Sequence, residues 1–176
     1  ILLTIPSIVT SLNLWQPQLK TDIEKIENVQ RRASKRIPEL KDMTYPERLR
    51  RLDLPSLKYR RLRGDMIECY KIMNNTYDKK VSKILTLRDH VVTSNRAKRG
   101  HSQMLYAEKS KKTKRKHFFS NRVVGPWNSL PQHVIDAEDI NAFKNRLEKC
   151  WRNQPCKYNP DMDYDYKVNR NSVSTP

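Results

Sequence analysis

The stretch "SLKYRRLRGDMIECYKIMNN" (residues 56–75) has the periodicity of an amphipathic helix and indicates the fold class of the chain. Apolar and aromatic residues recur at intervals of three and four, while the basic residues fall outside that stripe. Ser56 is placed to cap the start of the helix, and Asn74 and Asn75 mark its end. We interpret the stripe as a buried face rather than a cofactor site; it consists of Tyr59, Leu62, Met66, Cys69, Tyr70 and Met73.

The preceding stretch, "IEKIENVQRRASKRI" (residues 23–37), predicts a second amphipathic helix that ends at the following proline. Thr21 and Glu24 have capping-box spacing at its start, and Thr44 and Glu47 repeat that spacing before a short helix. The face predicted to be buried comprises Leu19, Ile23, Ile26, Val29, Ala33 and Ile37. The opposite face is cationic and carries Arg31, Arg32, Lys35 and Arg36.

Helical patterns return between residues 118 and 152. Phe119, Val123 and Trp127 share one helical face, and Pro126 is predicted to break or kink that helix near its end. Asp139 is placed to cap the last helix, whose apolar stripe comprises Ile140, Phe143, Leu147 and Trp151.

The other regions are less regular. The phrases "VSKILTL" and "QMLY" allow a small β-hairpin in the basic region 80–117, and the tail after residue 152 has hardly any aliphatic residue. We therefore predict a mainly α fold of several short amphipathic helices with a disordered C-terminal tail. Its four segments are a helical segment at 1–75, a basic loop or hairpin at 76–117, a second helical segment at 118–152 and the disordered tail at 153–176.

The net charge of +17, with a pI near 10, is the strongest functional signal in the composition. Self-repulsion on that scale favours a polyanionic partner. Nucleic acid is our first choice, and a packing role in ribosomes or chromatin and an anionic membrane surface are the alternatives. Only three glycines are present, which argues against a turn-rich all-β fold and against glycine-rich phosphate loops.

The sequence contains no recognisable catalytic motif or metal site. It lacks the nucleophile elbow, the H-E-x-x-H zinc motif, the P-loop and the dinucleotide fingerprint, and its four histidines are dispersed. Cys150 and Cys156 make a poor zinc half-site. Asp161, Asp163 and Asp165 begin like a calcium loop, but the positions that require Gly and Glu hold other residues. We expect no catalysis, no cofactor, no metal and no small-molecule substrate for this segment.

The apolar stretch "ILLTIPSIVTSLNLW" (residues 1–15) is too short to span a bilayer and has no basic leader, so we predict a packed segment and no membrane partner. The three cysteines are odd in number, which favours reduced thiols over a disulfide framework. The first residue is Ile rather than Met, and we interpret the chain as a piece of a longer protein.

Two basic clusters are the candidate binding residues, because Lys and Arg bind phosphate without reading sequence. The first lies on predicted helices, where Arg can make bidentate phosphate contacts, and comprises Arg31, Arg32, Lys35, Arg36, Arg60, Arg61 and Arg63. The second is predicted to be a flexible arm and comprises Lys111, Lys112, Lys114, Arg115 and Lys116. The same tract, "KKTKRK", is typical of a nuclear localisation patch. Five tyrosines lie among the basic residues, and we interpret most of them as packing rather than as base-stacking residues.

Several phrases occur in one order that resembles the C-terminal region of LINE-type, jockey-like non-LTR retrotransposon reverse transcriptases. They are "IEKIENVQRRASKRI" (23–37), "YPERLRRLDLPSLKYRRLRGDMIECYKIMN" (45–74), "RGHS" (99–102), "FFSNRVVGPWNSLP" (118–131) and "FKNRLEKCW" (143–151). The resemblance covers residues 15–151 and implies the end of the polymerase thumb, at 1–75, and the region that follows it. The Gly125-Pro126 pair departs from the usual polar pair before the tryptophan.

The resemblance implies a non-catalytic part of an RNA-directed DNA polymerase. The catalytic aspartates have no counterpart here, so magnesium is expected only in the polymerase core, which would lie upstream in the same polyprotein. The implied partners are that core and RNA or DNA, and the implied location is nuclear with a cytoplasmic ribonucleoprotein stage. Alternatives are a helical module that docks an acidic protein and an inactive relic of a mobile element; an intact enzyme ranks behind both.

Overall fold

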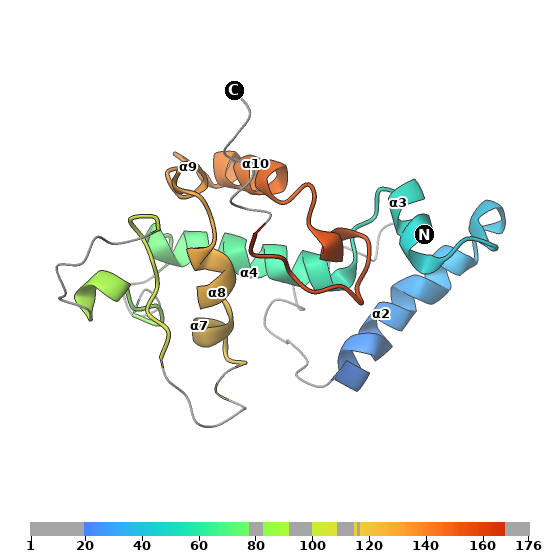
Figure 1. Cartoon of the computed structure of the whole chain (residues 1–176), viewed down its shortest axis with the longest axis horizontal. Helices are drawn as coiled ribbons and strands as arrows, with labels where there is room; N and C mark the ends of the chain where they lie inside the picture. The colour runs from blue at the N-terminus through green and yellow to red at the C-terminus, as the bar shows by residue number, and fades with distance from the viewer. Residues whose placement is uncertain (1–19, 78–82, 92–99, 109–114, 116, 168–176) are drawn as a thin grey trace. The chain divides into compact units, whose positions relative to one another are not determined.

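The computed structural model describes residues 20–77, 83–91, 100–108, 115 and 117–167. These residues are mainly helical, as predicted, and contain no β-strand. In chain order (Figure 1) the helices are α2 (Lys20–Lys35), α3 (Tyr45–Arg51), α4 (Leu57–Met73), α7 (Phe119–Arg122), α8 (Val124–Asn128), α9 (Gln132–Ile135) and α10 (Ile140–Cys150). Single 3-10 turns are η1 (Pro38–Leu40), η2 (Arg88–His90) and η3 (Pro155–Lys157).

The chain divides into two compact units. The first unit combines the described residues up to Gly64 with Asn153–Tyr164, and the second combines those of Asp65–Arg152 with those from Asp165 onward. The boundary therefore falls inside α4, and the predicted segments 76–117 and 118–152 join in one unit. The predicted segment 1–75 is divided between the two.

Helix α4 buries four of the six residues of the predicted stripe, and the other two, Leu62 and Met73, are half-buried. Tyr59, Met66, Cys69 and Tyr70 are buried, and Ser56 Oγ accepts the Tyr59 N–H at 3.1 Å as the predicted cap. Asn75 ends the helix in the left-handed region, at φ 53°. The N–H groups of residues 75 and 76 then donate to the carbonyls of residues 72 and 71, which is a Schellman motif.

Helix α2 is rotated from the predicted orientation, so that Ile23, Ile26 and Ile37 of the predicted face are only half-buried. Glu27 and Ser34 are its buried residues, whereas Ala33 is exposed and Val29 is 66% exposed. Periodicity predicted the apolar stripe as the inner face, but buried partners for two polar side chains decide the orientation. Leu19 of that stripe and the apolar stretch 1–15 lie outside the described residues.

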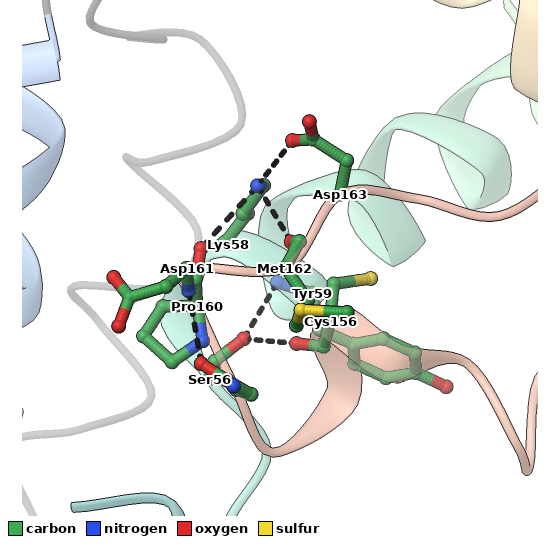
Figure 2. A network of polar contacts seen from close by, with 9 residues as sticks. Ser56, Lys58, Tyr59, Cys156, Pro160, Asp161, Met162 and Asp163 are labelled. Atoms are coloured by element: carbon green, nitrogen blue, oxygen red, sulfur yellow. Dashed lines mark hydrogen bonds and ion pairs between the residues drawn. The ribbon is translucent and has the colours of Figure 1, made fainter.

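The predicted disorder of the C-terminal tail does not hold for residues 153–167. Gln154 and Cys156 are buried, and η3 packs at the start of α4 (Figure 2). Ser56 Oγ donates to the Cys156 carbonyl at 2.7 Å, and Ser56 N–H donates to the Lys157 carbonyl at 2.7 Å. Backbone carbonyls hold this segment, and composition does not reveal such contacts. Residues 168–176 lie outside the described part.

The same segment binds a lysine of α4. Lys58 Nζ donates to the carbonyls of Pro160 and Met162 at 3.3 and 2.8 Å and pairs with Asp163 at 2.9 Å (Figure 2). Tyr158 Oη donates to Asp53 at 2.5 Å, which adds a contact to the turn before α4. Residues 153–163 are therefore an ordered strap on the first unit.

The hairpin considered for the basic region is reduced, in its described residues, to one antiparallel bridge. Leu87 and Leu105 are bridged, with Arg88 N–H donating to the Met104 carbonyl and Tyr106 N–H to the Thr86 carbonyl, both at 2.8 Å. These contacts bring 86–88 and 104–106 together without forming a strand.

The helical run that contains Pro126 is broken, as predicted, but the interruption lies three residues before the proline rather than near the end of the run. The short interruption lies at Val123, whose backbone is still right-handed helical (φ −74°, ψ −23°), and Pro126 lies inside α8. Since α8 begins at Val124, Pro126 occupies its first turn, where a helix has no acceptor for a backbone N–H.

Candidate nucleic-acid interface

A buried carboxylate organises the first unit. Glu27 of α2 accepts the Tyr45 hydroxyl at 2.7 Å and the Leu57 N–H at 3.1 and 3.3 Å. The carboxylate therefore contacts the first residues of both α3 and α4 and lies at the N-terminal, positive end of α4. Burial and then the neighbouring Glu27 carboxylate raise the pKa of Tyr45, so the phenol stays protonated and remains a donor.

A buried guanidinium completes this network. Arg48 of α3 donates to Ser34 Oγ at 3.1 Å, to the Met43 carbonyl at 2.6 Å and to the Arg31 carbonyl at 3.4 Å. The Arg48 and Arg31 guanidinium carbons lie 5.5 and 5.0 Å from the Tyr45 ring centroid. These bonds fix the rotation of α2, and Arg31, which also donates to Asn28, is half-buried.

The end of α2 presents three of the predicted cations to solvent. Arg32, Lys35 and Arg36 are exposed, and within the described part of the chain their side chains make no hydrogen bond or ion pair. The three residues lie within two successive turns, with i, i+3 and i+4 spacing. This side of α2 therefore carries three neighbouring positive charges, and no described carboxylate forms an ion pair with them.

Helix α3 adds two exposed cations that the sequence analysis did not select. Arg50 and Arg51 line an open hollow of about 490 Å³ together with Asp42, Met43 and Glu47. The Glu47 carboxylate caps the start of α3, where it accepts the Thr44 N–H and hydroxyl at 2.8 and 2.6 Å. Those two bonds lower the pKa of Glu47. The run "ERLRR" on a predicted helix was the signal available for Arg50 and Arg51.

The α4 arginines are less accessible than the sequence analysis assumed. Arg61 is only 4% exposed, so it cannot contact a phosphate at the surface of this structure, and we leave it out of the proposed surface. Arg60 and Arg63 are half-buried. Burial lowers the pKa of Arg60, although the Glu27 carboxylate opposes that effect.

In the second unit, residues 101–105, which follow Gly100 of "RGHS", contact residues 127 and 128 of "GPWNSLP". Gln103 N–H donates to His101 Nδ1 at 3.2 Å, so Nε2 carries the proton and donates to the Trp127 carbonyl at 3.0 Å. Trp127 Nε1 donates to the Gln103 carbonyl at 2.8 Å. Asn128 accepts the Leu105 N–H at 2.8 Å and donates to the Leu105 carbonyl at 2.9 Å, as a paired strand would. Residues 101–105 are thereby held on α8.

An aromatic core lies beneath these contacts. Tyr70 and Phe143 stack with centroids 4.3 Å apart, and the Trp127 and Phe143 centroids are 6.1 Å apart. Tyr70 Oη donates to the Ala137 carbonyl at 2.7 Å. Asp139 accepts the N–H groups of residues 141 and 142 as the predicted cap of α10, and these bonds lower its pKa.

One residue of the predicted flexible arm lies in the described part of this unit. Arg115, the one arm residue in the described part, is exposed and pairs with Glu108 at 2.7 Å. That pair joins the two residues that flank 109–114. Lys111, Lys112, Lys114 and Lys116 lie outside the described residues, so the structure does not locate them.

Other basic residues support the fold. Arg122 makes a bidentate pair with buried Asp65, at 2.8 and 2.9 Å, and its guanidinium lies 5.4 Å from the Phe119 ring centroid. Of the five tyrosines among the basic residues, Tyr45, Tyr59 and Tyr70 are buried, which confirms the packing interpretation for those three.

Neither a metal cluster nor a membrane-spanning helix is found in the described residues. No three His, Cys, Asp or Glu side chains there lie close enough to hold an ion, and Cys69, Cys150 and Cys156 are free thiols. No described helix combines the length and apolar character that crossing a bilayer requires.

The chain was compared with protein-family models, curated proteins and solved structures. No protein-family model, no curated protein and no solved structure matches the chain.

Proposed function

We propose that this chain is a non-catalytic nucleic-acid-binding segment of a retrotransposon reverse transcriptase. Its partner would be template RNA, primer–template duplex or target DNA, held through contacts between basic side chains and phosphates. The observation that carries the proposal is the exposed row of Arg32, Lys35 and Arg36, for which no described carboxylate is a partner.

The physical argument is a contrast within the first unit: Arg48 and Lys58 already have acceptors, and the row of Arg32, Lys35 and Arg36 does not. Arg48 and Lys58 are bonded to backbone carbonyls, a hydroxyl and a carboxylate. An exposed row of like charges raises the local potential, and phosphates that bind there release condensed counterions. Arg50 and Arg51 extend the positive charge of this unit onto α3.

The second basic cluster supports the proposal through its attachment. Asn128, Trp127 and His101 hold residues 101–105 on α8, and Glu108 pairs with Arg115. Glu108 and Arg115 are therefore adjacent, and the sequence between them carries Lys109, Lys111, Lys112 and Lys114.

The test compares salt dependence of binding for the full chain and two variants. Arg32→Gln, Lys35→Gln and Arg36→Gln together should lower the slope of log K against log salt by about 2–3 on duplex DNA, and weaken all sequences alike. The matched control replaces three exposed cations elsewhere, Lys149, Arg152 and Lys167, with Gln and should keep most of the slope. Equal losses in both variants would remove the α2 row from the proposal.

An acidic protein is the alternative partner for the same row. Competition separates the two: RNA should displace labelled DNA from the chain, whereas unrelated acidic proteins at equal charge should not. Displacement by the acidic proteins alone would favour the docking module. A chain that binds neither, yet unfolds cooperatively, would fit an inactive relic.

A further inference from the structure

One side of α2 in the first unit carries apolar side chains that are not buried. Val29 is 66% exposed, the largest value among the large hydrophobic side chains of the described residues, while Ala33 is exposed and Ile26 is half-buried. Their spacing of three and four residues places them on neighbouring turns, and we call them the α2 stripe. Single apolar residues are common on protein surfaces, whereas three neighbours form a patch. We propose that residues 1–15 of the same chain, which lie outside the described part, pack over the α2 stripe.

The α2 stripe is separate from the other two sides of the helix. At about 100° per residue, its centre lies roughly 115° round the helix from the buried Glu27 and Ser34. The same count places it roughly 100° from the exposed cationic row of α2. The bonds of Glu27 to Tyr45 and of Ser34 to Arg48 fix the rotation of α2, so the stripe cannot turn inward. A cover on the stripe would leave the cationic row in solvent.

The sequence before α2 has the composition that such a cover requires. Residues 1–19 contain no Asp, Glu, Lys or Arg, although these types make up 31% of the chain. In "ILLTIPSIVTSLNLW" nine of the 15 side chains are aliphatic or aromatic. The stretch is shorter than the about 20 residues that a membrane-spanning helix takes, so a protein surface is the apolar environment that it fits. Packing on the stripe would remove apolar area of both partners from water.

The covalent connection favours this segment over a second copy of the chain. The segment ends at Trp15, five residues before α2 begins at Lys20. The stripe extends from about 9 to about 20 Å along the helix axis, and 15 residues span about 22 Å even in the short rise of a helix. Pro17 lies in the connection, where a proline favours a turn. A tether this short gives an effective concentration on the order of millimolar, which a second copy does not reach in dilute solution.

The experiment measures how fast a thiol reagent labels the full chain carrying Val29→Cys, relative to the same variant in denaturant. Glu24→Cys is the matched control, because Glu24 is an exposed residue of the same helix outside the stripe. Val29→Cys should be labelled about 10- to 100-fold more slowly than Glu24→Cys, the range that burying one Val side chain supplies. The native thiols of Cys69, Cys150 and Cys156 are buried, so they should stay unreactive and report a folded chain. Equal labelling rates at the two positions would overturn the proposal.

A second set of substitutions identifies the cover. Ile5→Ser, Ile8→Ser and Leu12→Ser together, in the full chain, should raise the labelling rate of Val29→Cys to that of Glu24→Cys. Protection that survives these three substitutions would show that another surface covers the stripe. Protection that disappears on dilution would assign the cover to a second copy, and either result would overturn the proposal. None of these measurements uses nucleic acid, so their outcome is separate from that of the proposed function.

Trp15 gives a measurement that leaves the segment itself unchanged. Trp127 and Trp151 are fully buried, so the tryptophan emission that acrylamide quenches in the full chain should come from Trp15. Val29→Asp places a charge in the stripe and should increase this quenching. Lys35→Asp, at an exposed position on the cationic side of α2, is the matched control and should leave it unchanged. Equal quenching in the two variants would contradict packing of the segment on the stripe.

Discussion

The cores of the two units are built from different kinds of side chain. In the first unit, charged and polar side chains lie at the centre: Glu27 bonds to Tyr45 and Leu57, and Arg48 bonds to Ser34. In the second unit, rings lie there, and polar groups line the edge of the core. The first unit therefore contains two kinds of basic residue: those bonded within its core, such as Arg48, and those exposed to solvent, such as Arg32.

The largest loss of stability should come from a substitution in the aromatic core of the second unit. Trp127→Ala would open a cavity, and it would leave the Gln103 carbonyl without its indole donor. We expect a loss of about 3–5 kcal/mol in the free energy of unfolding, measured by denaturant titration followed by circular dichroism. Ile84→Ala serves as the control, and a loss below about 1 kcal/mol would show that the ring core does not dominate the second unit.

The second-largest loss of stability should come from a substitution in the polar core of the first unit. Glu27→Ala leaves the buried Tyr45 hydroxyl and the Leu57 N–H without their acceptor. We expect a loss of about 2–3 kcal/mol in the same titration. Glu24→Ala removes an exposed carboxylate one turn earlier and should cost less than about 0.5 kcal/mol. Equal losses of unfolding free energy in Glu27→Ala and Glu24→Ala would show that the buried carboxylate does not hold the first unit together.

A smaller effect should come from the strap. Ser56→Ala removes the cap of α4 and the bond to the Cys156 carbonyl. We expect a loss of about 1 kcal/mol, together with faster proteolysis between residues 153 and 164. Ser102→Ala, an exposed hydroxyl of the second unit, should leave that cleavage rate unchanged. Unchanged cleavage in Ser56→Ala would contradict the role given to this serine.

The smallest effect should be the pH dependence from His101. Burial lowers the pKa of His101, so below pH 6.5 the unfolded chain binds the proton more readily than the folded chain. Its contribution to stability is therefore complete above pH 6.5 and is lost as the pH falls towards the folded-state pKa. His101→Gln should make stability fall less steeply over pH 6.5–5, by less than one proton, in denaturant titrations at several pH values. A steeper fall would contradict the neutral, buried imidazole.

Periodicity predicted the fold well where burial follows hydrophobicity. The stripe of α4, the cap at Asp139 and the ring core of α10 follow directly from residue type and spacing. It failed on α2 because the acceptors and donors that pull Glu27 and Ser34 inward, on Tyr45, Arg48 and Leu57, come from other helices. Side-chain spacing within one helix contains no information about them.

The candidate site was predicted only in part for a related reason. Sequence identifies an arginine but does not distinguish one that bonds to backbone carbonyls, such as Arg48, from one that remains in solvent, such as Arg32. Burial removed Arg61 from the predicted set, and exposure added Arg50 and Arg51. The buried pair of Arg122 with Asp65 joins residues 57 positions apart, which no local pattern reveals.

The strap also orders events during synthesis. Its residues 153–163 bond to Ser56 and Lys58, about a hundred positions earlier in the chain. A ribosome releases the helices of the second unit before it releases this strap, so the first unit begins before those helices and is completed after them. Until the strap emerges, Ser56 and Lys58 at the start of α4 lack the carbonyl partners that it supplies.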